Sequence, residues 1–137
     1  METIINSHVF EHLNRHTLLS PNQYGFRKNM SCVLHLLKCK NDWTNLIDVR
    51  KAVNVVYIDF CKAFDSVSHQ KLLFKLEKYG ITGKCFSWVK DFLTGRSQKV
   101  KVGDSFSDEH NVTSGVPQGS VLGPTLIFIL DFYKLFT

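Results

Sequence analysis

Two carboxylates flank a short turn in the middle of the chain, and both could do chemistry. Asp59 ends a run of β-branched and aromatic residues, and Asp65 follows six positions later. A carboxylate at the tip of a buried strand is costly unless a cation meets it, and enzymes that handle nucleotides commonly supply a divalent metal there. Asp59 is therefore a candidate metal ligand. The alternative is a strand-end aspartate that accepts hydrogen bonds from backbone N–H groups in a turn.

The residues that follow Asp59 leave two roles open. Phe64 could form the wall of a nucleotide pocket, or it could be an ordinary core residue. Asp65 could be a second metal ligand, or a carboxylate in the first turn of the next helix, where the helix dipole favours negative charge. We favour the structural role for Asp65.

A second constellation is the loop SGVPQGS at residues 114–120. Gly115, Pro117 and Gly119 give a stiff backbone with few side chains, which a flat ligand can approach closely. The amide of Gln118 can both donate and accept hydrogen bonds, which suits the edge of a base or sugar. A hairpin loop without a function would look similar, but it would rarely need so many special residues.

Basic residues form two further candidates. Arg27 and Lys28 could contact phosphates, and a second basic stretch contains Arg96, Lys99 and Lys101. The chain carries a formal net charge of +5. This balance fits a polyanionic partner such as nucleic acid, although a solvated surface with extra lysines would account for it equally well.

Cysteine spacing and hydropathy exclude several other classes. The four cysteines (residues 32, 39, 61 and 85) form no C-x-x-C pair, so we do not expect a structural zinc site. No signal peptide is visible, and the apolar run at 126–130 is too short to cross a bilayer. We therefore expect free thiols and an intracellular protein, cytoplasmic or nuclear, that is neither secreted nor membrane-bound.

The hydrophobic pattern predicts a single α+β domain in which helices pack on a small antiparallel sheet. Helices are expected at about 4–18, after the N-caps Ser31, Ser68 and Thr82, and after Pro124. Strands are expected at residues 53–60, 98–102 and 108–113, and the first should be buried on both faces because its apolar content is nearly continuous.

Four stretches, in this order, resemble the reverse transcriptases of non-LTR (LINE-like) retrotransposons. They are SPNQYGFRK (20–28), VYIDFCKAFDSVSH (56–69), LTGRSQKV (93–100) and SGVPQGSVLGP (114–124). The resemblance implies part of a right-hand polymerase fold, with fingers at about 1–52 and the first half of the palm at about 53–137. It also implies an RNA template, a DNA primer and deoxynucleoside triphosphates as partners.

The same resemblance assigns roles to individual residues. Asp59 and the carbonyl of Phe60 become ligands of two Mg²⁺ ions, with Asp59 the catalytic carboxylate. Phe64 becomes the steric gate against a ribose 2′-hydroxyl. Gln118 and Gly119 become contacts to the nucleotide and template, and Arg27 a contact to the triphosphate. Lys28, Arg96, Lys99 and Lys101 are candidate contacts to nucleic acid.

One expected feature is missing from the sequence. The family's third palm motif carries two adjacent aspartates, but these 137 residues contain no Asp-Asp pair, and Asp131 stands alone. The residues Asn29 and Met30 also depart from the pattern that follows Gly-Phe-Arg. We therefore expect a truncated polymerase fragment without activity of its own. The alternatives are a non-catalytic nucleic-acid-binding remnant or a product with no stable fold.

Overall fold

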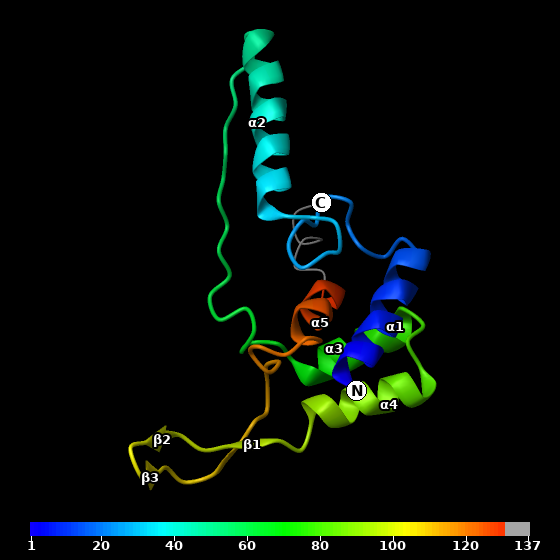
Figure 1. The fold of residues 1–137 in the computed structure, drawn as a ribbon, viewed down its shortest axis with the longest axis vertical. Helices are drawn as coiled ribbons and strands as arrows, with labels where there is room; N and C mark the ends of the chain where they lie inside the picture. The colour runs from blue at the N-terminus through cyan, green and yellow to red at the C-terminus, as the bar shows by residue number, and fades with distance from the viewer. Residues whose placement is uncertain (131–137) are drawn as a thin grey trace. The chain divides into compact units, whose positions relative to one another are not determined.

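The computed structural model describes residues 1–130 and has the α+β composition that the sequence predicts (Figure 1). Asp131 lies outside the described residues. The helices are α1 (Glu2–Arg15), α2 (Cys32–Asp48), α3 (His69–Lys78), α4 (Gly83–Leu93) and α5 (Gly123–Ile129). The strands are β1 (Ser97–Gln98), β2 (Lys101–Val102), β3 (Ser105–Phe106) and β4 (His110–Asn111).

The chain forms two compact units. Unit 1 comprises Met1–Leu19 together with the described residues from Lys62 onward, and unit 2 comprises Ser20–Cys61. Unit 1 therefore contains four of the helices and all four strands, whereas unit 2 contains α2. The predicted limits of fingers and palm are not tested by this division and stay a prediction.

A single apolar core holds unit 1 together. α3 packs against both α4 and α5, and α1 packs against α5. Each helix turns one apolar stripe inward, as expected for amphipathic surface helices. The residues with no more than 1% exposure are Val9, Leu13, Val67, Leu72, Leu76, Val89, Leu93, Leu122, Leu126 and Ile129. Burying each such side chain stabilises the fold by roughly 1.5–3 kcal/mol, so this core is the main source of stability in unit 1.

The helix boundaries follow local capping chemistry. Ser31 caps α2 by accepting the N–H of Leu34 at 3.1 Å, and Ser68 caps α3 by accepting the N–H of Lys71 at 3.4 Å. Both caps confirm the predictions from sequence. Gly80 follows α3 with φ +80°, a left-handed conformation that glycine adopts without steric cost.

A hydrogen bond joins the first turn of α1 to the residue that precedes α5. The carboxylate Oε1 of Glu2, in the first turn of α1, accepts the backbone N–H of Leu122 at 2.7 Å. Leu122 immediately precedes α5, whose N–H groups at this end lack helical partners. The bond therefore fixes the start of α1 to the start of α5 within unit 1.

The predicted arrangement of helices on a sheet is wrong for the described residues. β1 pairs with β4 and β2 pairs with β3, both antiparallel, and every residue of the four strands is exposed. They form an interrupted hairpin that extends away from the helices of unit 1 (Figure 1). The helices pack on one another because each carries an apolar stripe. The strands of the hairpin contain too few apolar residues to form a face that could be buried against the helices.

The predicted buried strand at 53–60 is also wrong. These residues form an irregular, extended segment, and Val56 and Tyr57 are 80% and 85% exposed. A strand exists only where a neighbouring strand accepts its backbone hydrogen bonds. Within the described residues, β1–β4 pair with each other and none pairs with this segment.

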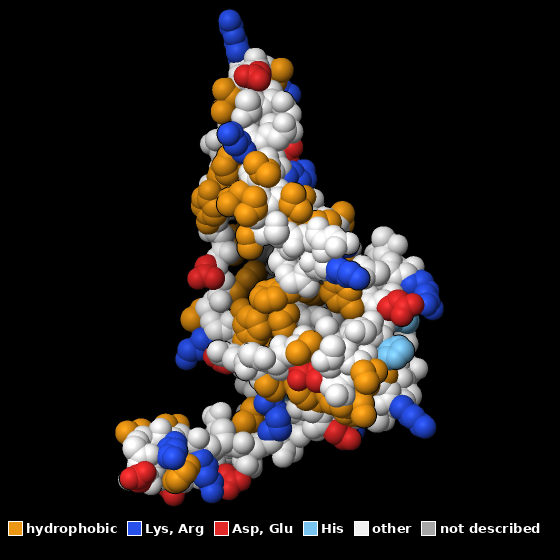
Figure 2. All heavy atoms as spheres, viewed as in Figure 1, with side chains coloured by type: hydrophobic (Ala, Val, Ile, Leu, Met, Phe, Trp, Pro, Cys, Tyr) orange, Lys and Arg blue, Asp and Glu red, His pale blue; other side chains and the backbone are white. Residues whose placement is uncertain are grey.

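Unit 2 exposes much of its apolar surface. α2 carries apolar side chains along its length, but none of its 17 residues is buried; Val33, Leu36 and Ile47 are all more than 60% exposed. Hydrophobic side chains therefore line the surface of this unit (Figure 2). No helix among the described residues is long and apolar enough to span a membrane.

Candidate functional site

Asp59 lies in the exposed extended segment of unit 2, and its side chain is solvent-accessible. The prediction that it ends a buried strand is wrong, so the burial argument for a metal does not hold for this structure. Among residues 1–130, no three His, Cys, Asp or Glu side chains gather as metal ligands would. One exposed carboxylate and the Phe60 carbonyl do not fit a centre for two Mg²⁺ ions, which needs several anionic ligands. The metal role of both residues stays a prediction.

The next predicted residues lie in a tight turn at which the chain returns to unit 1. The carbonyl of Lys62 accepts the N–H groups of Asp65 at 3.0 Å and Ser66 at 2.9 Å, and Lys62 has φ +51°. Phe64 is half-buried and packs against the core, whereas Asp65 is exposed. The ring of Phe64 is thus held by the core on one side, which is compatible with either of the roles considered for it.

Hydrogen bonds join this turn to the 114–120 loop. Ser114 Oγ donates to the Asp65 carbonyl at 2.9 Å, and the Val116 N–H donates to the Phe64 carbonyl at 2.9 Å. The Gly115 N–H donates to the Val67 carbonyl at 2.8 Å. Two segments about 50 residues apart are therefore fixed to each other by backbone groups and the Ser114 hydroxyl, within a single unit.

The contact between these segments is close enough to require glycine. Gly115 has φ +85°, and a Cβ built there would lie 3.0 Å from both Cα and the carbonyl oxygen of Asp65. It would also lie 3.1 Å from the Phe64 carbonyl oxygen. Backbone atoms cannot move aside as a flexible side chain can, so the loop approaches the turn only because residue 115 has no side chain.

Asp65 and Gln118 complete the junction with a side-chain contact. Gln118 Nε2 donates to Asp65 Oδ1 at 3.0 Å. Because a carboxylate only accepts, this contact fixes which end of the Gln118 amide faces Asp65 and leaves its carbonyl oxygen on the other side. Asp65 therefore contacts Gln118, the candidate nucleotide contact, directly. The place in the first turn of a helix that we favoured for Asp65 is wrong, because α3 begins only at His69. Gly119 follows with φ +80° and is exposed.

A polar cleft of about 560 Å³ opens beside this junction. It lies wholly within unit 1, and its lining is mostly amides, hydroxyls and backbone, with one acid and one base. The lining residues are Asp65, Arg96, Gln98, Asn111, Val112, Thr113, Ser114, Gly115, Val116, Pro117 and Gln118. Such a surface can form hydrogen bonds to a base, a sugar or a phosphate, and it offers little to an apolar ligand.

The carbonyl of Gly115 accepts two hydrogen bonds on the side of the loop away from the turn. His69 Nε2 lies 2.8 Å from this oxygen, and Arg96 Nη2 donates to it at 3.0 Å. Arg96 Nε also donates to the Leu93 carbonyl at 2.9 Å, and partial burial lowers the pKa of the guanidinium from its usual value. We assigned His69 no role from the sequence, although it ends the 56–69 stretch that carries the family resemblance.

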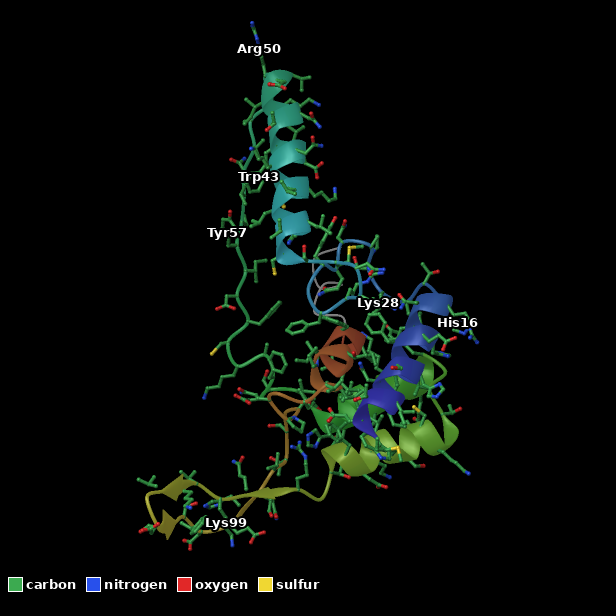
Figure 3. The ribbon with its side chains drawn as sticks, in the orientation of Figure 1. His16, Lys28, Trp43, Arg50, Tyr57 and Lys99 are labelled. Carbon is green, nitrogen blue, oxygen red and sulfur yellow. The ribbon has the colours of Figure 1, made fainter. Side chains whose placement is uncertain are left out.

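The other basic candidates take part in local contacts. Arg27 donates to the Ser20 carbonyl at 2.9 Å in unit 2, and Lys28 is exposed (Figure 3). In the hairpin of unit 1, Lys99 forms an ion pair with Glu109 at 3.2 Å. Lys101 lies over the Phe106 ring, 5.4 Å from its centroid. None of these contacts buries the charge, and the predicted roles of these residues toward nucleic acid stay predictions.

Comparisons with known proteins identify what this arrangement is similar to. Residues 2–135 match the family described as "Reverse transcriptase (RNA-dependent DNA polymerase)". A probable RNA-directed DNA polymerase from transposon X-element of Drosophila melanogaster is 33% identical over 91% of this chain. A second, from transposon BS of the same organism, is 32% identical over 99% of the chain.

A third relative is the RNA-directed DNA polymerase from mobile element jockey of Drosophila funebris. It is 32% identical over 84% of this chain. The chain spans only 12–14% of the length of these three relatives. No solved structure gives a significant match.

Proposed function

Because this chain belongs to the reverse transcriptase family, with its relatives among non-LTR retrotransposons, we propose that it is a segment of an RNA-directed DNA polymerase. The reaction is the addition of deoxynucleotides to the 3′ end of a DNA primer on an RNA template. The family implies a nucleic-acid template, nucleotide substrates and a divalent metal. The assignment of this segment to fingers and palm is part of the proposal.

The observation that carries the proposal is the junction of the 62–66 turn with the 114–120 loop. It brings Phe64 and Gln118, which the family pattern assigns to the incoming nucleotide, into one unit. The Val116–Phe64 and Gln118–Asp65 hydrogen bonds connect them over a sequence separation of about 50 residues. Two candidate contacts held by one rigid framework favour a common ligand.

The role proposed for each residue follows from its chemistry. Phe64 acts as the gate because its half-buried ring is held by the core and cannot swing away from a sugar. Gln118 offers its free carbonyl oxygen and remaining N–H to the nucleotide or template. The exposed backbone of Gly119 permits close approach of the same ligand.

We further propose that these 137 residues do not polymerise by themselves. Asp59 and the Phe60 carbonyl supply too few ligands for a two-metal centre. Losing essential metal ligands removes most of the rate enhancement of a metal-dependent transferase.

A primer-extension assay tests the proposed inactivity. The purified chain is incubated with an RNA template, a labelled DNA primer, deoxynucleoside triphosphates and Mg²⁺, beside an Asp59→Ala variant. We expect no incorporation by either protein. Incorporation by the unmodified chain that Asp59→Ala abolishes would overturn the proposed inactivity while supporting the role of Asp59.

A direct binding assay tests the nucleotide contacts. The primer–template duplex is titrated with the chain and with Gln118→Ala, and Gln98→Ala serves as a control because it removes another amide from the same cleft. We expect the larger loss for Gln118→Ala. Equal affinities for all three proteins would refute the proposed contact.

A second candidate function is non-catalytic binding of nucleic acid, and the hairpin favours it. All residues of β1–β4 are exposed, and Lys101 and Phe106 lie at the surface of the hairpin. Lys99 is also exposed there (Figure 3). Basic and aromatic side chains together suit single-stranded nucleic acid, because the basic groups contact phosphates and the aromatic rings stack on bases. RNA titrations at several salt concentrations give the slope of the logarithm of the binding constant against the logarithm of the salt concentration. The magnitude of this slope should be smaller by about one in Lys101→Gln. Failure to bind RNA even at low ionic strength would exclude this function.

A further inference from the structure

The carbonyl oxygen of Gly115 is held by two side chains that come from different elements. His69 Nε2 lies 2.8 Å away and must donate, because a carbonyl oxygen only accepts. Arg96 Nη2 donates to the same atom at 3.0 Å. Two donors use both lone pairs of the oxygen, so they fix its direction as well as its position.

Both donors are themselves anchored to the core of unit 1. His69 is the first residue of α3 and is 8% exposed. Arg96 is tied to the end of α4 by the Nε bond to the Leu93 carbonyl, and Leu93 is fully buried. The loop is therefore held in place by two packed helices in addition to the 62–66 turn.

The peptide that these donors hold lies directly between the groups that form the junction. The N–H of Gly115 donates to Val67, and the next N–H, of Val116, donates to Phe64. Gln118 reaches Asp65 three residues after Gly115. A rotation of the Gly115 carbonyl would therefore displace Val116 from Phe64 and Gln118 from Asp65 together.

We propose that His69 and Arg96 are positioning residues that hold the 114–120 loop in its binding geometry through the Gly115 carbonyl. This inference rests on the proposed function, since it gives the loop a ligand to be positioned for. Arg96 acts on the loop as an internal donor, and the guanidinium nitrogen facing Gly115 is not available to a phosphate. His69 acts by donating one hydrogen bond, and its packing is secondary.

The hydrogen bonds from His69 and Arg96 to the Gly115 carbonyl are called the clamp below. Amide hydrogen exchange of the complete chain tests the clamp without any ligand. Two replacements separate donation from packing: His69→Gln keeps a donor, whereas His69→Phe keeps a buried ring. Losing one buried hydrogen bond should raise the exchange rate of the Gly115 and Val116 amides about tenfold in His69→Phe, with a smaller rise in His69→Gln. His8→Phe, at an exposed position on α1, is the matched control and should leave both amides unchanged.

Faster amide exchange in His69→Gln than in His69→Phe would overturn the role of His69 as a donor. If His69→Phe protects the two amides and His69→Gln exposes them, the residue acts by packing. If neither variant changes them, the hydrogen bond does not hold the loop.

Arg96→Lys tests the second donor. Lysine keeps the positive charge but has one terminal nitrogen, so it cannot bridge the Leu93 and Gly115 carbonyls as the guanidinium does. We expect exchange at Gly115 and Val116 to rise roughly fivefold. Unchanged exchange together with weakened RNA binding would identify Arg96 as a phosphate contact and overturn its positioning role.

A binding experiment connects the clamp to function. Affinity for the RNA–DNA primer–template duplex is measured for His69→Phe, Gln118→Ala and the double variant. If His69 acts through Gln118, the double variant should bind no more weakly than Gln118→Ala alone. Additive losses would refute the positioning role. An unchanged affinity in Gln118→Ala would instead refute the proposed function of the loop, while the exchange experiment would still decide whether the clamp exists.

Discussion

Replacing Gly115 with alanine should dislodge the 114–120 loop, and the structure predicts by how much. The new Cβ would lie 3.0–3.1 Å from three backbone atoms of Phe64 and Asp65. These atoms belong to a hydrogen-bonded turn and cannot retreat independently. The loop must therefore withdraw and give up the Gly115–Val67 and Val116–Phe64 hydrogen bonds.

The cost can be built from its parts. A residue with a Cβ at positive φ costs about 1–2 kcal/mol, and two lost hydrogen bonds cost about 1 kcal/mol each. Fewer unfolded conformations for alanine offset roughly 0.4–1 kcal/mol of this. The free energy of unfolding should therefore fall by about 3 kcal/mol, which lowers the midpoint of thermal unfolding by roughly 10 °C.

Gly95→Ala supplies the matched control. Gly95 also has a positive φ, +68°, and follows α4 in the same unit, but a Cβ there would meet nothing within 4 Å. It should cost only the backbone term, about 1 kcal/mol after the unfolded-state offset. Urea denaturation followed by circular dichroism would measure both variants. If Gly115→Ala costs no more than Gly95→Ala, the close contact between loop and turn does not contribute as described.

Three further predictions follow from burial and charge. Leu76→Ala, in the core, should lower the free energy of unfolding by about 2–5 kcal/mol, whereas Leu36→Ala, 68% exposed on α2, should change it by less than about 0.5 kcal/mol; equal losses in urea denaturation would contradict the assignment of the core. Burial raises the pKa of the Cys85 thiol, so at neutral pH Cys85 should react with a maleimide more slowly than the exposed Cys61. Mass spectrometry of timed samples measures both rates, and faster modification of Cys85 would contradict this prediction. Hydrogen bonds from Ser97 and then Lys99 lower the pKa of Glu109, so these bonds should stabilise the hairpin fully at a pH above the usual glutamate pKa and stop doing so as the pH falls through the lowered pKa. The NMR chemical shifts of the β1 and β4 amides should follow this titration, and Glu109→Gln should abolish the change.

Local signals in the sequence predicted the helices well. Ser31 and Ser68 are caps in the structure because capping is decided by one side chain and the next few N–H groups. The core face of α1, with Val9 and Leu13, also follows directly from helical spacing. The family resemblance is confirmed, since the motifs that carry it are read from the sequence without reference to the fold.

Pairing over long distances in the sequence could not be predicted in the same way. Residues 53–60 have the composition of a strand, but a strand also needs a partner, and none of the described strands pairs with it. The contact of Asp65 with Gln118 and the two donors on Gly115 join residues that are 19 to 53 positions apart. The sequence identified these residues as candidates or as members of a family motif, but only the structure brings them together and shows the contact of His69 with Gly115.

The bond between Glu2 and Leu122 has a consequence for the order of folding. It spans 120 positions, and α1 also packs against α5, so within unit 1 the helix that is synthesised first packs against the helix that is synthesised last. Until α5 has emerged, Val9 and Leu13 have no complete core to enter. Contacts of such long sequence separation slow folding and prolong the exposure of apolar surface. During synthesis, α1 is therefore the segment of unit 1 that stays longest within reach of a chaperone.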